Sequence, residues 1–150
     1  ISQVSWSDVV YQDTPHKFEA GTPSIADVLG LGAAIELINQ YSLEDWATHE
    51  AHLLEDLETF LRKDPKVTLY VPDSKRCGII SFSYEGAHAS DVGEILDQMG
   101  VAVRAGHHCA QPFMKELGVS GTVRISLGPY NNSKDVDLFC RAFKKVQELL

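Results

Sequence analysis

Apolar residues recur at helical spacing over two long stretches in the first half of the chain. Residues 24–41 are apolar on nearly every side of a helix, and Pro23 suits the start of that helix. A second helix follows, behind a plausible capping box formed by Ser42 and Asp45. A helix that is apolar all round is normally covered on several sides. We therefore expect residues 24–41 to pack against a larger body or a second copy of the chain.

The second half of the chain alternates in the manner of short strands. Residues 66–71 and 78–84 are predicted to pair as antiparallel strands, joined by a turn at 72–76. Residues 101–103 are typical of a buried strand, and residues 122–127 alternate as a half-covered strand does. The pattern therefore predicts a small antiparallel sheet.

Two further helices accompany these strands. One spans residues 90–99 and is stopped by Gly100, and the last begins near Ser133 with one apolar face. Residues 1–23 follow neither the helical nor the strand period. We infer an α+β fold in which the helices lie against one face of a short sheet.

Composition narrows the class of protein. With 150 residues and 44% hydrophobic content, the chain is large enough for one ordinary core. A formal charge of −8 argues against a nucleic-acid surface. Three scattered cysteines fit a reducing compartment rather than a disulfide framework. Neither a signal peptide nor an apolar run long enough for a bilayer is visible, so we expect a cytoplasmic protein without a membrane partner.

Candidate chemistry gathers in one loop, where Cys109 follows Arg104, His107 and His108. A thiol reacts as its thiolate, which cationic neighbours stabilise, so Cys109 is the predicted reactive residue of the protein. The other two cysteines, Cys77 as a strand residue and Cys140 on the last helix, are placed in the core. A zinc site is the alternative, but structural zinc sites usually show paired ligands, so no metal is expected. The two histidines are either loop packing or proton-transfer groups.

Three motifs resemble one family. The nucleophile loop reads RAGHHCAQP (residues 104–112) and is followed by VRISLGPYN (residues 123–131). Far upstream, FEAGTP (residues 18–23) precedes GLGAA (residues 30–34). In this order the motifs resemble group II cysteine desulfurases of the Suf and Csd types, members of the class V aminotransferase family. The resemblance covers almost the whole chain, and Gln111-Pro112 is closer to the Csd-type branch.

The resemblance implies a fold-type I pyridoxal phosphate enzyme that acts as a homodimer. Such enzymes convert L-cysteine to L-alanine and an enzyme persulfide, which passes to a SufE-like acceptor for iron–sulfur cluster assembly. By this resemblance Cys109 is the nucleophile, Arg124 grips the substrate carboxylate and Arg104 is a second active-site arginine. Thr22 is expected to reach the cofactor phosphate of the neighbouring subunit. Residues 1–41 then correspond to the end of the large cofactor-binding domain and a linking helix, and residues 42–150 to the small C-terminal domain.

One departure from the family pattern concerns the cofactor lysine. The family holds its cofactor through a lysine in a Ser-x-His-Lys motif. The one His-Lys pair of this chain, His16-Lys17, lacks the glycine-rich continuation of that motif. We therefore expect the chain to correspond to the last third of the enzyme, and to be inactive by itself.

Other functions stay open on the sequence alone. A selenocysteine lyase or a kynureninase-like hydrolase shares the scaffold, and the kynureninase reaction would not require Cys109. A non-catalytic binding module, with the His-His-Cys loop as metal ligands, is the alternative outside enzymes.

Overall fold

The chain divides between Ser42 and Leu43 into two units, Ile1–Ser42 and Leu43–Leu150. The computed structural model describes residues 1–70 and 77–150. The predicted turn at 72–76 therefore lies outside the described residues.

The first unit combines a short hairpin with one long helix. Strands β1 (Gln3–Val4) and β2 (Val9–Val10) pair antiparallel. A single 3-10 turn, η1 (His16–Phe18), and helix α1 (Ile25–Ile38) follow. The hairpin differs from the irregular segment expected at residues 1–23, because strands of two residues are too short to produce a period. Every residue of α1 is exposed within this chain, so what covers the helix stays a prediction.

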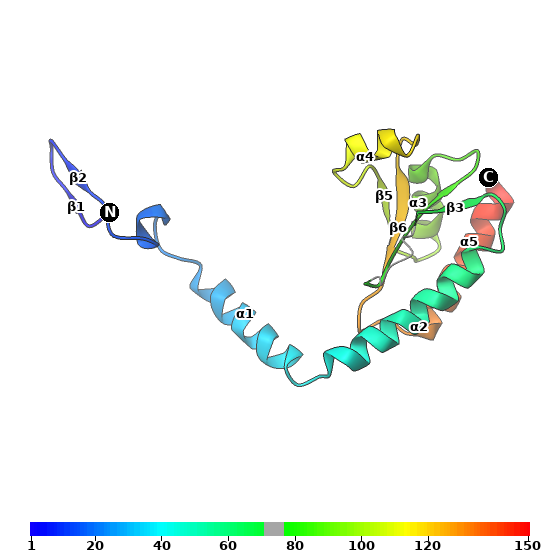
Figure 1. Cartoon of the computed structure of the whole chain (residues 1–150), viewed down its shortest axis with the longest axis horizontal. Helices are drawn as coiled ribbons and strands as arrows, with labels where there is room; N and C mark the ends of the chain where they lie inside the picture. The colour runs from blue at the N-terminus through cyan, green and yellow to red at the C-terminus, as the bar shows by residue number, and fades with distance from the viewer. Residues whose placement is uncertain (71–76) are drawn as a thin grey trace. The chain divides into compact units, whose positions relative to one another are not determined.

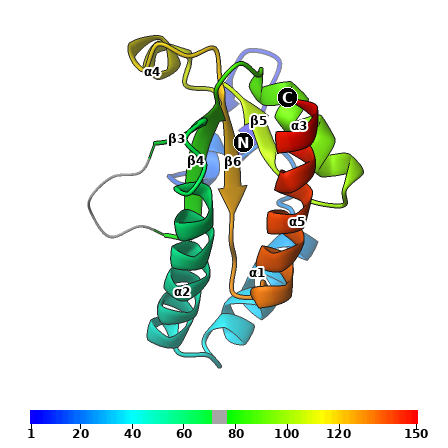
Figure 2. The same cartoon turned by 90° about the vertical axis from the view of Figure 1, so that its right-hand side faces the viewer.

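The second unit (Figure 1) is built on a four-stranded antiparallel sheet, whose strands lie in the order β3-β4-β6-β5 (Figure 2). Its strands are β3 (Val67–Leu69), β4 (Ile79–Tyr84), β5 (Arg104–Gly106) and β6 (Thr122–Ser126). The predicted pairing of the first two strands is confirmed, and β6 confirms the half-covered strand at 122–127.

Three helices cover one face of this sheet (Figure 2). They are α2 (Leu43–Leu61), α3 (Ala89–Gln98) and α5 (Ser133–Leu149). The core lies between them and the strands, where the ring of Phe143 meets that of Phe82 edge-on at 5.7 Å and stacks on that of Phe139. The predicted α+β architecture is therefore confirmed.

Local signals place the helix ends close to the predicted positions. Gly100, at φ +81°, follows α3 in a left-handed conformation that glycine adopts readily. At the start of α5 the Asn132 side chain accepts from the Lys134 amide at 2.9 Å, and the Asp135 carboxylate accepts from the Asn132 amide at 2.9 Å. This reciprocal capping fixes the start of α5 at Ser133.

Two further predictions were wrong. The strand expected at 101–103 lies three residues later, because β5 pairs with β6 through Arg104–Gly106, whereas Val101 and Val103 are partly buried against the core. Cys77 is exposed and precedes β4, so it is not a core residue. Cys140 does pack against the core, and burial raises the pKa of its thiol.

Candidate active site

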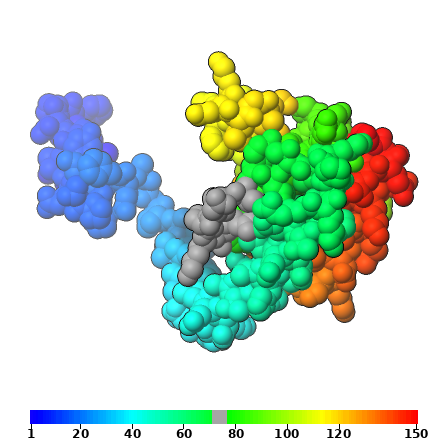
Figure 3. Space-filling model, turned by 45° about the vertical axis from the view of Figure 1, so that its right-hand side comes forward, coloured from blue at the N-terminus to red at the C-terminus, as the bar shows by residue number. Residues whose placement is uncertain are grey.

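The loop that carries Cys109 joins β5 to the short helix α4 (Gln111–Glu116), which projects from the second unit (Figure 3). Gly106 has φ +121°, a conformation that glycine adopts readily because it has no Cβ. His108 and Cys109 then follow with φ +55° and +58°. Left-handed backbone is unfavourable for residues with a Cβ, so two in succession mark a tightly held turn. The turn leaves Cys109 exposed, as its predicted role requires.

The polar groups around Cys109 come from its own loop and from β5. Arg104 Nη2 donates to the Cys109 sulfur at 3.8 Å. The Cys109 amide donates to His107 Nδ1 at 3.1 Å, and the Ala110 amide donates to the His107 carbonyl at 2.8 Å. A guanidinium beside an exposed sulfur stabilises negative charge there, whether on a thiolate or on a sulfur bonded to it.

The two predicted arginines lie opposite each other across β5 and β6. Arg104 and Arg124 are register partners in that strand pair. Like charges placed directly opposite repel, so the pair favours an anion between or above the two guanidiniums. Arg124 is half-buried, and its Nε is buried without a hydrogen-bond partner among the described residues. The strand pair therefore offers an unused donor to a carboxylate or phosphate.

His108 is a residue whose role sequence reasoning left open. Its Nε2 lies 3.1 Å from the Thr122 carbonyl oxygen and 2.9 Å from the Thr122 hydroxyl. Burial lowers the pKa of the His108 imidazole, and the positive charges of Arg124 and Arg104 lower it further. The hydrogen bond to the Thr122 backbone raises the pKa of His108 and so partly offsets these effects. Sequence reasoning gave no signal for this bond, because Thr122 falls on the polar positions of the predicted strand, whereas the structure buries it.

Thr22 lies in the first unit, where it is exposed. It follows Gly21, which has φ +77°, so the residue enters α1 from a turn. The nearby pair identified in the sequence has local contacts: His16 Nδ1 lies 3.0 Å from Glu19 Oε2, and Lys17 Nζ lies 5.3 Å from the centre of the Phe18 ring. The structure thus places Arg104, Cys109 and Arg124 together, and Thr22 in the other unit.

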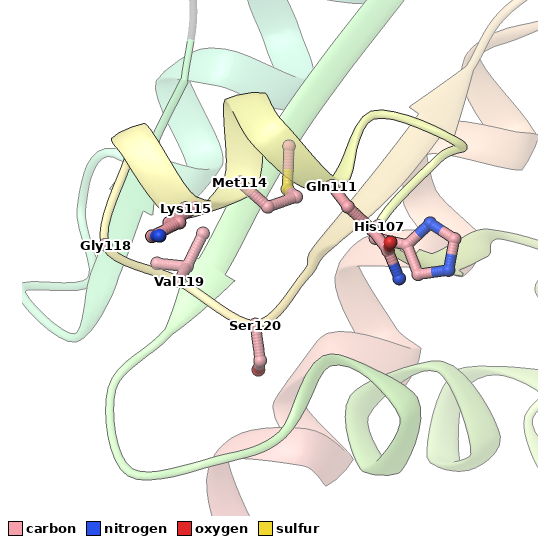
Figure 4. Close-up of a pocket in the computed structure, with 7 residues that line it drawn as sticks. All are labelled: His107, Gln111, Met114, Lys115, Gly118, Val119 and Ser120. Carbon is pink, nitrogen blue, oxygen red and sulfur yellow. The ribbon is translucent and has the colours of Figure 1, made fainter.

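A shallow pocket of about 370 Å³ lies beside the loop, under α4 (Figure 4). It is lined by His107, Gln111, Met114, Lys115, Gly118, Val119 and Ser120. Among residues 1–70 and 77–150, no group of three or more histidine, cysteine or acidic side chains is placed to hold a metal ion. Within the same described residues, no helix is both long and apolar enough to cross a bilayer.

Comparison with known proteins assigns the family. Residues 1–139 match the family model described as aminotransferase class-V. The chain belongs to this family. The match includes both units and therefore the Cys109 loop, the two arginines and Thr22.

Two relatives of the chain carry the name cysteine desulfurase, one of them as a probable member. The chain is 40% identical over 156 residues to cysteine desulfurase CsdA of Escherichia coli, covering 100% of the chain and 37% of that relative. It is 44% identical over 149 residues to a probable cysteine desulfurase of Staphylococcus epidermidis, covering 99% and 36%. The chain thus spans little more than a third of the length of these relatives.

Solved structures agree with the fold. The crystal structure of E. coli CsdA in an S-sulfonic acid form superposes with a TM-score of 0.89 at 38% identity, over 99% of this chain and 37% of that one. The apo cysteine desulfurase of Thermococcus onnurineus also gives 0.89, at 37% identity over 100% and 38%. A NifS-like protein of Rickettsia africae, at 22% identity and 0.77, shows the fold alone.

Proposed function

We propose that the chain is the C-terminal part of a pyridoxal phosphate-dependent cysteine desulfurase, with Cys109 as the residue that receives sulfur. The observation that carries this proposal is the exposed Cys109 sulfur, held on a strained turn 3.8 Å from Arg104 Nη2. The likeness to cysteine desulfurases over the whole chain supports it. The reaction consumes L-cysteine and yields L-alanine and a persulfide.

Sulfur transfer is the step assigned to Cys109. Its thiolate attacks the sulfur of the substrate cysteine, so that an S–S bond forms as the substrate Cβ–S bond breaks. The electron pair of the broken bond stays with the carbon, which takes up a proton and becomes the methyl group of alanine. Pyridoxal phosphate, when bound, withdraws electrons from the substrate and makes this bond cleavable. Arg104 stabilises negative charge on the Cys109 sulfur before transfer and on the persulfide after it.

Anion binding is assigned to the arginines and to Thr22. Arg124 has a buried Nε that lacks a partner within the part of the chain that the structure describes, and its planar donor group suits the substrate carboxylate. Arg104, opposite it across the strand pair, adds a second positive charge. The exposed Thr22 hydroxyl is proposed to reach the cofactor phosphate of the neighbouring subunit, so a homodimer would complete the site. These donors fit a cofactor phosphate and a substrate carboxylate.

The persulfide on Cys109 is proposed to pass to a SufE-like acceptor protein for iron–sulfur cluster assembly. Exposure of the loop and the projection of α4 beside it fit transfer to another protein. The Schiff-base lysine is proposed to lie outside this chain, because His16 and Lys17 have local contacts and lack the motif's continuation. The chain alone is therefore proposed to be inactive.

Replacing Cys109 by alanine in the enzyme that contains this chain tests the sulfur-transfer step. Cys109→Ala should abolish alanine release while cysteine still binds, because the thiolate acts after substrate binding. The matched control is Cys77→Ala, which removes another exposed thiol and should leave alanine release unchanged. Unchanged alanine release by Cys109→Ala would contradict the proposed function. Assaying the wild type with L-cysteine and, separately, with L-selenocysteine distinguishes a cysteine desulfurase from a selenocysteine lyase.

Replacing Arg124 tests substrate recognition. Arg124→Ala removes a charge-assisted contact worth about 1.5–3 kcal/mol, so KM for cysteine should rise about tenfold or more. Arg124→Lys keeps the charge but loses the bidentate geometry, and we expect an intermediate KM. The measurement is steady-state alanine production. Equal KM values in the wild type and Arg124→Ala would show that Arg124 does not bind the substrate.

A further inference from the structure

The His108 side chain links the nucleophile loop to the end of β6. Its Nε2 lies within hydrogen-bond distance of both oxygens of Thr122, at 3.1 Å and 2.9 Å. Thr122 is 1% exposed, so the loop is attached to a fixed point inside the fold. A carbonyl oxygen only accepts hydrogen bonds, so Nε2 carries the hydrogen. Nδ1 is buried and has no partner among the described residues, which leaves the Thr122 bond as the imidazole's anchor.

The backbone of the loop requires such an anchor. His108 and Cys109 both have positive φ, a conformation that residues with a Cβ leave readily unless their surroundings fix it. The two bonds to His107, from the Cys109 and Ala110 amides, lie within the loop itself. The His108 bond differs from these because it joins the turn to the sheet.

We propose that His108 is a positioning residue for Cys109: its bond to Thr122 holds the turn in the conformation that places the thiol beside Arg104. The inference rests on the proposed function only in taking Cys109 as the reacting residue. His108 acts through the backbone and touches neither sulfur nor substrate in this scheme. Without the bond, φ at His108 and Cys109 relaxes to negative values and the sulfur leaves Arg104 Nη2.

Alkylation of the purified chain by iodoacetamide at pH 7, followed site by site with mass spectrometry, tests the inference. The three cysteines give three readouts. Alkylation of Cys109 reports on the loop, that of exposed Cys77 on the reactivity of the reagent, and that of half-buried Cys140 on the integrity of the core. His108→Ala should slow alkylation of Cys109 about fivefold, the effect of losing one cation about 4 Å away in a water-rich setting. Cys77 should react as before and Cys140 should stay protected.

Two further variants show whether the hydrogen bond is responsible. His108→Gln presents an amide donor near the position of Nε2 and should restore most of the Cys109 rate. The matched control is His49→Ala, because His49 Nε2 also bonds a backbone carbonyl oxygen, that of Asn131, at 2.7 Å. That variant lacks one bond of the same kind and should leave the Cys109 rate unchanged.

The outcomes separate the inference from the proposed function, because alkylation needs neither cofactor nor substrate. Equal Cys109 rates in the wild type and His108→Ala, with Cys140 protected, would overturn the positioning role. Slow alkylation of Cys109 in the wild type would instead count against its role as nucleophile. If Cys140 becomes alkylated in His108→Ala, the test uses His108→Leu instead. Its side chain fills the space of the imidazole but cannot donate a hydrogen bond. Exposure of Cys140 in that variant too would make His108 a residue of the core and overturn the inference.

Discussion

Cys109 illustrates how a reactive residue depends on backbone as much as on neighbouring charge. Its exposure follows from two consecutive left-handed residues, and its cationic neighbour Arg104 comes from the preceding strand. The sequence indicated the thiol and its neighbour, because the two residues are only five positions apart and a cation beside a thiol is a recognisable chemical pairing. The conformation was not predictable, because positive φ at His108 and Cys109 contradicts the local preference of both residues.

The free energy of unfolding should depend on pH through His108. Burial and the nearby arginines lower its pKa in the folded chain below the ordinary 6.5, so folding favours the neutral imidazole. The resulting stability is fully present above pH 6.5, and it is lost as the pH falls through 6.5 toward the lowered value, because the unfolded chain binds the proton first. The charged groups facing this imidazole are Arg104, Arg124 and His107.

Urea unfolding at pH 7.5 and pH 5.5 measures this contribution. The wild type should lose more stability between the two pH values than His108→Gln, which has no titrating group at that position. The same loss in both proteins would show that His108 does not control the pH dependence.

At the scale of elements, the junction of β5 and β6 decides where the loop starts. Gly121 precedes β6, and a Cβ built on it would lie 2.8 Å from the carbonyl carbon of Gly106. The two strand ends therefore approach more closely than any side chain at 121 permits. The pattern of Val101 and Val103 predicted a strand there, because partly buried valines alternate in the same way whether or not their backbone pairs.

Gly121→Ala should destabilise the chain by about 2–3 kcal/mol, because its Cβ meets backbone that cannot rotate away. Gly118→Ala is the matched control: it also lies between α4 and β6, at φ +73°, but a Cβ there meets nothing within 4 Å. That change should cost about 1 kcal/mol, from backbone conformation alone. Urea unfolding measures both, and an equal cost would show that the close approach to Gly106 is not restrictive.

At the scale of the whole molecule, the two units differ in what holds them together. The buried core runs from Leu53 to Val146 and lies entirely in the second unit. The described residues of the first unit are all exposed, including the apolar side chains of α1. Hydrophobic periodicity predicted the sheet and its helices well, because these elements bury their apolar faces within the chain. It could not predict what covers α1, because periodicity shows that the faces of a helix are apolar but not which surface packs on them.

Residues 43–150 expressed alone should fold with the same urea midpoint as the whole chain. The reason is that all of the buried core lies within them. Circular dichroism at low protein concentration measures the midpoint without contributions from association through α1. A clearly lower midpoint would show that residues 1–42 stabilise the second unit.

The brevity of the outer strands has a consequence for aggregation. In the four-stranded sheet the edges are β3 and β5, with three residues each. β5 carries a positive charge at Arg104 and ends at Gly106, whose φ of +121° is not a β-strand conformation. Short, charged and kinked edges are poor templates for an incoming strand from another molecule. Amyloid-type growth from the β5 edge of this sheet is therefore disfavoured, even in a chain that exposes an apolar helix.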